Sequence, residues 1–484
     1  MINQFVFLLY IGILGSGFLF LFKKRLGLVN RYLLSLPVGL SLWVFMLLVL
    51  LVAGLPFNSF AVLLLSLLLL VMFIVLNFIY KNFSKVDFKY FSIFMICYSA
   101  AAIFFLSVNS SFFSNDSWRL LMGGKHIGLS SVLTNSMISI SGVYSYVIHA
   151  SSGFFGFDYL YAVYPLTAFS FFLFFIFNLH DPSRSGKFAI NSQLFFCFIS
   201  AVFLLSAYFV FFNAFYVHSN MLFGLFSFIA LFGLWKRVKE KEKCWLIISA
   251  IALLSSCFLR IEGPLFSLIV IVILISRKDI SFKEKLLFFG SIFLFVSVWH
   301  IKIFFAFDSF SNNFLNSERI LLILFLYFIT LVSLLIGQMK PFNRIKENYP
   351  LIMLYALSII WSYLILVRGI KFKGGVPVLR GYGELILNIV KNGSWGVTWI
   401  VLIVLFLAAL ALKRVNNESV FLYYIFSFGL LFNAINLFRG GWREGWGDSG
   451  NRMLMHIIFI LAFYVFLKFK NAFFPDIEEN VQKT

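Results

Sequence analysis

The chain has 484 residues, of which 62% are hydrophobic and 12% charged, whereas soluble domains hold about 45–50% apolar and about 25% charged residues. A soluble globule cannot bury that much apolar surface, so the composition predicts an integral membrane protein and excludes soluble enzymes, DNA-binding proteins and secreted scaffolds. The net charge of +20 would suit a nucleic-acid partner, but in a membrane protein Lys and Arg first set the orientation.

Long apolar runs follow one another along the whole chain, and a helical span needs about 20 such residues. They predict an all-α, polytopic transmembrane helical bundle of 13–15 spans. The candidate spans lie near 4–22, 32–55, 61–80, 91–108, 158–178, 193–213, 221–235, 244–259, 264–276, 286–307, 320–339, 351–367, 397–412, 420–438 and 456–469. Two of them, 221–235 and 264–276, are short and are expected to be tilted or partly re-entrant.

The basic residues divide unequally between the two sets of loops. With the N-terminus outside, the cytoplasmic loops and the C-terminal tail hold 26 of the 39 Lys and Arg residues. This is the bias of the positive-inside rule, so we expect an outside N-terminus and a cytoplasmic C-terminus. Most of the positive charge then serves topology and anionic lipid headgroups, and no nucleic-acid partner is expected.

The first apolar run is interpreted as a retained span, because it lacks a basic start and a small-residue cleavage site. The 4 cysteines have no metal-ligand spacing, so they are interpreted as packing residues and no metal site is predicted. No extramembrane domain is expected, since the longest loop, 109–157, is itself half apolar. Polar chemistry must therefore occur at a membrane face.

The loop after the fourth predicted span begins with Asn115-Asp116-Ser117-Trp118. Trp118, Leu121 and Met122 recur at helical spacing, which predicts helices lying in the membrane interface within this outer loop. Asp116 would stand at the N-terminus of the first such helix. An Asp in that place caps a helix without any chemistry, so a capping role is the competing interpretation.

A second polar group, Arg260-Ile261-Glu262-Gly263-Pro264, interrupts an apolar stretch. Opposite charges next to hydrocarbon are costly unless they are paired or functional, and Gly-Pro predicts a tight break between two short spans. The pair is either a set of anchors at a hairpin tip or part of a site, and we favour the site. Lys302, inside the tenth span, must reach the interface or meet an anion such as phosphate.

Two later outer loops carry further candidates. The loop 368–396 is rich in basic residues and glycines, which is typical of a mobile functional loop and equally of a solvated one. The stretch 439–452 leads into the last span and contains Trp442, Arg443, Trp446 and Arg452. The tryptophans suit a membrane interface or stacking on a sugar ring, and the arginines suit a phosphate.

The order of these features resembles that of the GT-C superfamily of membrane glycosyltransferases, which includes polyprenyl-phosphate-sugar-dependent mannosyltransferases and aminoarabinose transferases. The resemblance rests on the acidic loop start at 115–119, the aromatic stretches 142–146 and 155–158, the R-P-E-G-like 260–263, and the turn 451–454. It departs from the superfamily in having Ile261 for proline and one acid in place of a pair in the first loop. A single acid gives no support for a divalent metal ion, and no other cofactor is expected.

The resemblance covers 91–469 as a catalytic transmembrane module, preceded by a three-span extension, 1–90, and followed by a cytoplasmic tail, 470–484. It implies an integral protein of the bacterial inner (plasma) membrane. It also implies transfer of a sugar, with inversion, from a polyprenyl-phosphate carrier at the outer face. The acceptor is expected to be a glycan, lipid or protein.

The resemblance also implies roles for the polar residues. Asp116 is expected to be the catalytic base. The expected substrate- and phosphate-binding residues are Arg260, Glu262, Lys302, Arg443 and Arg452, and the sugar-stacking residues are Trp442 and Trp446.

Two other functions remain open from the sequence. A many-span polysaccharide polymerase or ligase would use a polyprenyl-diphosphate donor and the basic loop 368–396, and would not need Asp116. A lipid-linked-sugar transporter or flippase commonly has inverted repeats and charges near the bilayer midplane. No convincing repeat is found here and the charges cluster at one face, which disfavours the transporter.

Overall fold

The computed structural model describes the chain except for residues 56, 83, 109–111, 131–141, 181–186, 307–314, 340–341, 372–377, 414–416, 440–442, 444, 446–448 and 475–484. The described residues are helical almost throughout, and their only β-structure is an isolated parallel bridge between Phe112 and Tyr216. The prediction of an all-α membrane protein is confirmed as far as helix content and apolar helix length are concerned.

The helices, in chain order, are α1 (Ile2–Phe20), α2 (Leu28–Leu33), α3 (Ser35–Ala53), α4 (Ser59–Ile79), α5 (Lys85–Val108), α6 (Asn115–Ser130), α7 (Gly142–Phe155), α8 (Val163–Leu179), α9 (Lys187–Ser206), α10 (Tyr208–Phe215), α11 (Ser219–Glu240) and α12 (Lys243–Leu259). They continue with α13 (Gly263–Ser276), α14 (Phe282–Ala306), α15 (Ser317–Ile336), α16 (Asn343–Glu347), α17 (Tyr349–Lys371), α18 (Val378–Leu387), the π-helix η4 (Asn388–Asn392), α19 (Thr398–Ala411), α20 (Ser419–Arg439), α21 (Ser449–Met453) and α22 (Met455–Phe473).

Among the described residues, 10 helices are long and apolar enough to cross a membrane, or up to 11 if the bent pair α9–α10 is one span. The four shorter apolar helices α8, α12, α13 and α19 coincide with further predicted spans. The predicted span 193–213 is not one straight helix, because α9 and α10 meet at 82°. The break is at Ala207, whose backbone is extended, and Phe209 N–H bonds the carbonyl of Ser394 at 3.0 Å outside the helix.

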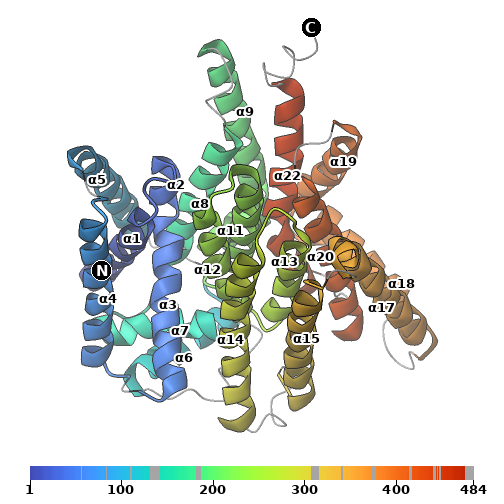
Figure 1. Cartoon of the computed structure of the whole chain (residues 1–484), viewed down its shortest axis with the longest axis horizontal. Coiled ribbons are helices and arrows are strands. Elements are labelled where there is room, and N and C mark those ends of the chain that lie inside the picture. The colour runs from blue at the N-terminus through green and yellow to red at the C-terminus, as the bar shows by residue number, and fades with distance from the viewer. Residues whose placement is uncertain are drawn as a thin grey trace.

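Most helices run alongside one another, whereas α6 and α7 lie across one end of the bundle (Figure 1). We call this the α6–α7 end. The end of α12 lies there too, because the backbone at Gly142 of α7 contacts the Phe258 carbonyl and Arg260. Gly142 has a left-handed φ of +68°, and a Cβ on it would lie 2.3 Å from that carbonyl oxygen, so this approach requires glycine.

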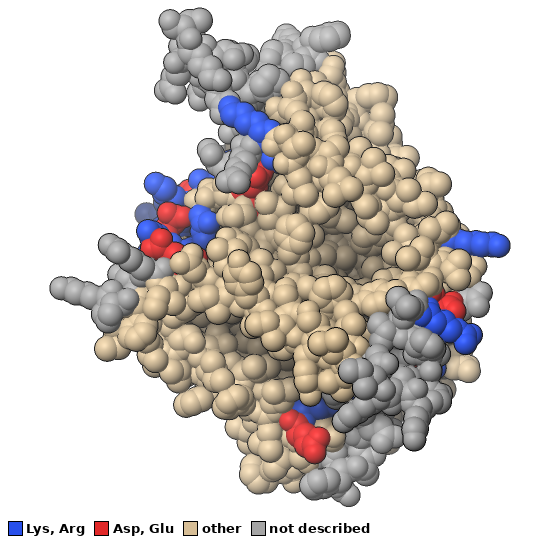
Figure 2. Space-filling view, turned by 90° about the vertical axis from the view of Figure 1, so that its right-hand side faces the viewer, with Lys and Arg blue, Asp and Glu red and all other residues tan. Residues whose placement is uncertain are grey.

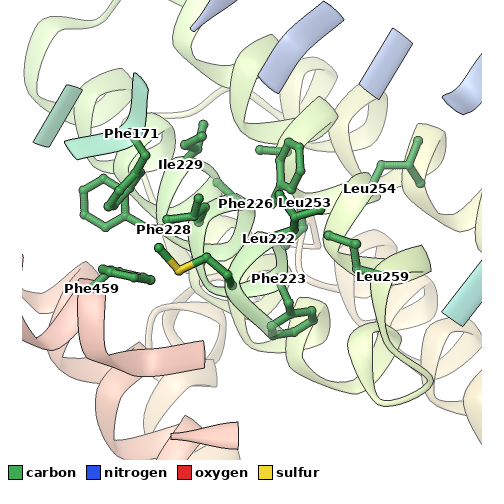
Figure 3. Packing of buried hydrophobic residues seen from close by; sticks show 14 of the residues in the cluster. Phe171, Leu222, Phe223, Phe226, Phe228, Ile229, Leu253, Leu254, Leu259 and Phe459 are labelled. Carbon is green, nitrogen blue, oxygen red and sulfur yellow. The ribbon is translucent and has the colours of Figure 1, made fainter. Parts of the chain in front are cut away.

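The core is aromatic and centres on α8, α11 and α22. Phe171 of α8 packs edge-on against Phe228 of α11 at 5.2 Å and against Phe459 of α22 at 4.9 Å, measured between ring centroids (Figure 3). By contrast, α4, α5, α15 and α17 leave much of their apolar surface exposed. One face of the molecule is accordingly apolar across its middle, with charged side chains near its edges (Figure 2), as expected for contact with hydrocarbon.

The N-terminal helices pack into the same bundle. The α1–α3 crossing brings backbones together at Gly15 and Gly39, the small-residue packing typical of membrane helices. Trp43 of α3 donates its indole N–H to Ser151 of α7 at 2.9 Å. Helix α3 thereby contacts α7, the helix whose first residue, Gly142, also approaches Arg260.

Ion pairs join helices at the end opposite α6 and α7. Arg237 of α11 binds Glu284 of α14 at 2.9 Å. Lys468 of α22 binds Glu418 at 2.9 Å, and both side chains are buried. Because their partners are neighbouring helices or loops, these charges serve the packing of the bundle.

Candidate functional site

The structure brings Asp116 and Arg452 together although 336 positions separate them in the sequence. Asp116 lies in the first turn of α6 and Arg452 in the short helix α21 before the last long helix. A carboxylate oxygen of Asp116 is 3.5 Å from a guanidinium nitrogen of Arg452. The Asp116 side chain is 49% exposed and the Arg452 side chain 18% exposed, so the pair sits at an open edge of the molecule.

The N-terminus of α6 is capped by serines, which leaves the Asp116 carboxylate to other interactions. The backbone N–H of Ser117 donates to the Ser114 hydroxyl at 3.3 Å, and the Ser114 N–H donates to the Ser117 hydroxyl at 3.1 Å. The Ser114 hydroxyl also bonds the Tyr216 hydroxyl at 2.6 Å. Asp116 is thus not the capping side chain of α6.

Arg260 lies in the short connection between α12 and α13, and, like Arg452, it acts electrostatically on His218. Its guanidinium donates to the Asn220 side-chain oxygen at 3.0 Å and lies 3.4 Å from the Glu262 carboxylate. Arg260 and Glu262 are 3% and 5% exposed, so the two predicted residues form a buried ion pair. Such a pair is stable only when its hydrogen bonds hold it in place, and Asn220 supplies one of them.

Two histidines complete the arrangement. His218, at the start of α11, is buried and stacks on Tyr216 with ring centroids 5.3 Å apart. Burial, and next the positive charges of Arg452 and Arg260, lower the pKa of His218 well below its ordinary value, so it is neutral at physiological pH.

His456, in the first turn of α22, is 1% exposed, and neither ring nitrogen has a hydrogen-bond partner among the described residues. It lies within electrostatic reach of Arg260 and His218. Arg260, Arg452, His218 and His456 are called the His–Arg cluster below.

Sequence reasoning missed His456, because it stands at the start of an apolar run and resembles a packing residue. The available signal was its position four residues after Arg452, since an ionisable residue at the end of a span is a functional candidate. Sequence reasoning gave His218 no role either.

A scaffold of asparagines positions the turn that carries Arg452. The indole N–H of Trp395 donates to the Asn451 side-chain oxygen at 2.7 Å, and the Asn451 amide donates to the Gly393 carbonyl at 3.2 Å. The Asn388 amide donates to the Arg443 carbonyl at 2.8 Å. The first two bonds tie the residue before Arg452 to the segment before α19. Sequence reasoning gave none of the three donors a role, although Asn451 begins the turn 451–454.

The remaining predicted site residues lie elsewhere. The Lys302 ammonium donates to the carbonyls of Leu51 and Val52 at 2.6 and 2.9 Å, so it binds the C-terminal turn of α3 and is not in the cluster. The Arg443 side chain is exposed. Trp442 and Trp446, the predicted sugar-stacking residues, lie outside the described residues.

A cavity of about 30 Å³ lies beside Arg260, lined also by Gly142, Phe258, Trp299 and His300. This is room for about one or two water molecules. Within the described part of the chain, no three His, Cys, Asp or Glu side chains lie close enough together to hold a metal ion. The exposed carboxylate of Asp116 thus lies beside the partly exposed Arg452, and Arg260, His218 and His456 of the cluster are buried.

The chain was compared with known protein families, with curated proteins and with solved structures. None of the three comparisons finds a match.

Proposed function

We propose that this protein is an integral-membrane glycosyltransferase. It moves a sugar, with inversion, from a polyprenyl-phosphate carrier to an acceptor hydroxyl on a glycan, lipid or protein. The observation that carries the proposal is the pairing of the half-exposed Asp116 with Arg452 at the edge of the His–Arg cluster. A base beside a phosphate-binding group is the combination that this transfer requires.

In this proposal Asp116 is the general base. The acceptor hydroxyl gives its proton to the Asp116 carboxylate while its oxygen forms a bond to the anomeric carbon of the sugar. The bond from that carbon to the phosphate oxygen breaks, and the electron pair leaves with the phosphate. The exposure of Asp116 supports this role, since an acceptor can reach it from outside.

Arg452 and the nitrogen donors behind it would bind the leaving phosphate. Guanidinium groups suit phosphate because their N–H donors match its oxygens. Arg452 is the cluster member that pairs with Asp116, and Arg260 would add a positive charge that Glu262 partly balances. A pre-organised donor of this kind is worth about 10²–10³ in kcat.

The apolar surface of the bundle supports a lipid-linked donor, because such a donor remains in the bilayer while its phosphate reaches the α6–α7 end. The positive-inside bias of the loops would place that end outside, as in a bacterial inner membrane. The N-terminus would then be outside and the C-terminus cytoplasmic.

The test compares the wild type with Asp116→Asn and Asp158→Asn in nanodiscs. Asp158 is a matched control because it lies nearby, after α7, is 93% exposed and pairs only loosely with Lys125 at 3.8 Å. Each protein receives a panel of polyprenyl-monophosphate and polyprenyl-diphosphate sugars, and release of the carrier phosphate is followed. The proposal expects release from a monophosphate donor that Asp116→Asn lowers by about 10² or more and that Asp158→Asn leaves unchanged.

Other outcomes would overturn the proposal in defined ways. Turnover of a diphosphate donor that persists in Asp116→Asn would indicate a polysaccharide polymerase or ligase. Movement of a lipid-linked sugar across the bilayer, with no carrier release, would indicate a flippase.

A further inference from the structure

A groove open to the side of the bundle separates α3 from α14. It has a volume of about 240 Å³, and all its lining residues are apolar or aromatic. Phe258 and Trp299 form the floor and are only 3% and 6% exposed, whereas Val49, Leu294 and Val298 on the rim are 46%, 59% and 40% exposed. Because both walls are candidate membrane spans, the open side faces hydrocarbon.

Contacts between α3 and α14 close the groove at both ends. At one end the rings of Phe45 and Phe295 meet with centroids 6.1 Å apart. At the other, Lys302 donates to the carbonyls of Leu51 and Val52. The two contacts are six to seven positions apart on α3 and seven on α14, which corresponds to about 10 Å of helix.

The floor of the groove is also the wall of the Arg260 cavity. Phe258 and Trp299 line both spaces, and their rings meet edge to face at 6.2 Å. One aromatic pair thus separates a space open to lipid from the buried guanidinium of the proposed phosphate-binding cluster. The groove ends at the ammonium of Lys302, which has three N–H donors and uses two on carbonyls.

We propose that this groove binds the prenyl chain of the lipid carrier next to its phosphate, an inference that rests on the proposed function. The chain enters sideways from the bilayer between α3 and α14, with its phosphate toward Lys302 and Arg260. Charge complementarity supports this occupant, since both cations lie at the α6–α7 end of an otherwise apolar space. The N-terminal helices then take part in substrate binding, and Lys302 contacts the carrier without belonging to the His–Arg cluster.

The test uses undecaprenyl phosphate with a photoreactive diazirine on an isoprene unit near the phosphate, and the protein in nanodiscs. Labelling is mapped by peptide sequencing and needs no sugar transfer. The expected label is on residues 48–53 of α3 and 294–299 of α14, and excess unlabelled undecaprenyl phosphate removes it.

Two substitutions fill the groove from opposite walls, Val49→Trp on α3 and Val298→Trp on α14. The matched control is Val71→Trp on α4, since Val71 is 45% exposed against 46% for Val49 and does not line the groove. Each groove substitution is expected to lower labelling at least tenfold, whereas the control leaves it unchanged.

Unchanged labelling in both folded groove variants would overturn the inference. Equal competition by phosphatidylglycerol would overturn it too, because the groove would then hold an ordinary bilayer lipid. The proposed function fails separately: groove labelling without turnover of any monophosphate donor supports the groove and refutes the transferase. Turnover that neither groove substitution changes refutes the groove alone.

Discussion

The crossing of α6 and α7 sets the position of Asp116, and the substitution Gly124→Ala tests it. A Cβ on Gly124 would lie 2.3 Å from the Cβ of His149 and 2.6 Å from the carbonyl oxygen of Tyr146. Carbon atoms pack at about 3.5–4.0 Å, so the helices must separate locally by more than about 1 Å. Overpacking of this kind costs about 1–3 kcal/mol in the free energy of unfolding.

Because Asp116 lies two turns before Gly124 on the same helix, the separation moves the carboxylate relative to Arg452. A misplacement of 1 Å can lower a rate about 10²-fold. Gly124→Ala is therefore expected to lower both the melting temperature in detergent and the transfer rate. The control is Gly290→Ala in α14, where an added Cβ meets nothing within 4 Å and Ala favours the helix by about 1 kcal/mol. Wild-type stability and activity in Gly124→Ala, or an equal loss in Gly290→Ala, would refute this account of the crossing.

Two further predictions concern stability. Lys468→Met removes an ion-pair partner of the buried Glu418 carboxylate and is expected to cost about 3–5 kcal/mol in denaturant unfolding. Lys278→Met, from an exposed pair at 2.7 Å, is expected to cost at most about 1 kcal/mol. Equal losses in the two variants would contradict the role of burial. Burial lowers the pKa of His149 to about 3 from 6.5, so the unfolded chain takes up this proton at a higher pH than the folded one. The free energy of unfolding should then fall by about 1.4 kcal/mol for each pH unit below 6.5. His149→Gln is expected to remove this pH dependence, whereas the control substitution His126→Gln, at an exposed histidine, is expected to leave it in place.

The helices were largely predictable from the sequence, because apolar run length is a local property. Each of the fifteen predicted segments coincides with a helix or, at 193–213, with a bent pair. That bend could not be predicted, since it depends on the hydrogen bond between Phe209 and the distant Ser394. Which of these helices cross a bilayer, and in which direction, stays a prediction.

The candidate site was predictable residue by residue but not as an arrangement. Asp116 and Arg452 were singled out separately, and only the packing of α6 against the short helix α21 makes them partners. Lys302 was expected to reach the interface or to meet an anion, yet its hydrogen bonds go to carbonyls of α3, a helix assigned to the N-terminal extension. His456 was hidden by its apolar neighbours, and its contact with Phe223 of α11, at 4.3 Å between ring centroids, follows from the packing of α22 on α11.

The sequence by itself therefore determined that this is a membrane protein of many helices and that its polar residues lie in a few connections. Composition, run length and charge settle those properties without knowledge of any contact. Only the tertiary structure decided which polar groups meet, because Asp116, Arg260, His218 and Arg452 come from segments far apart in the chain. Their distances depend on how the helices pack, and that packing is set by shape and by glycine contacts such as those at Gly124 and Gly142.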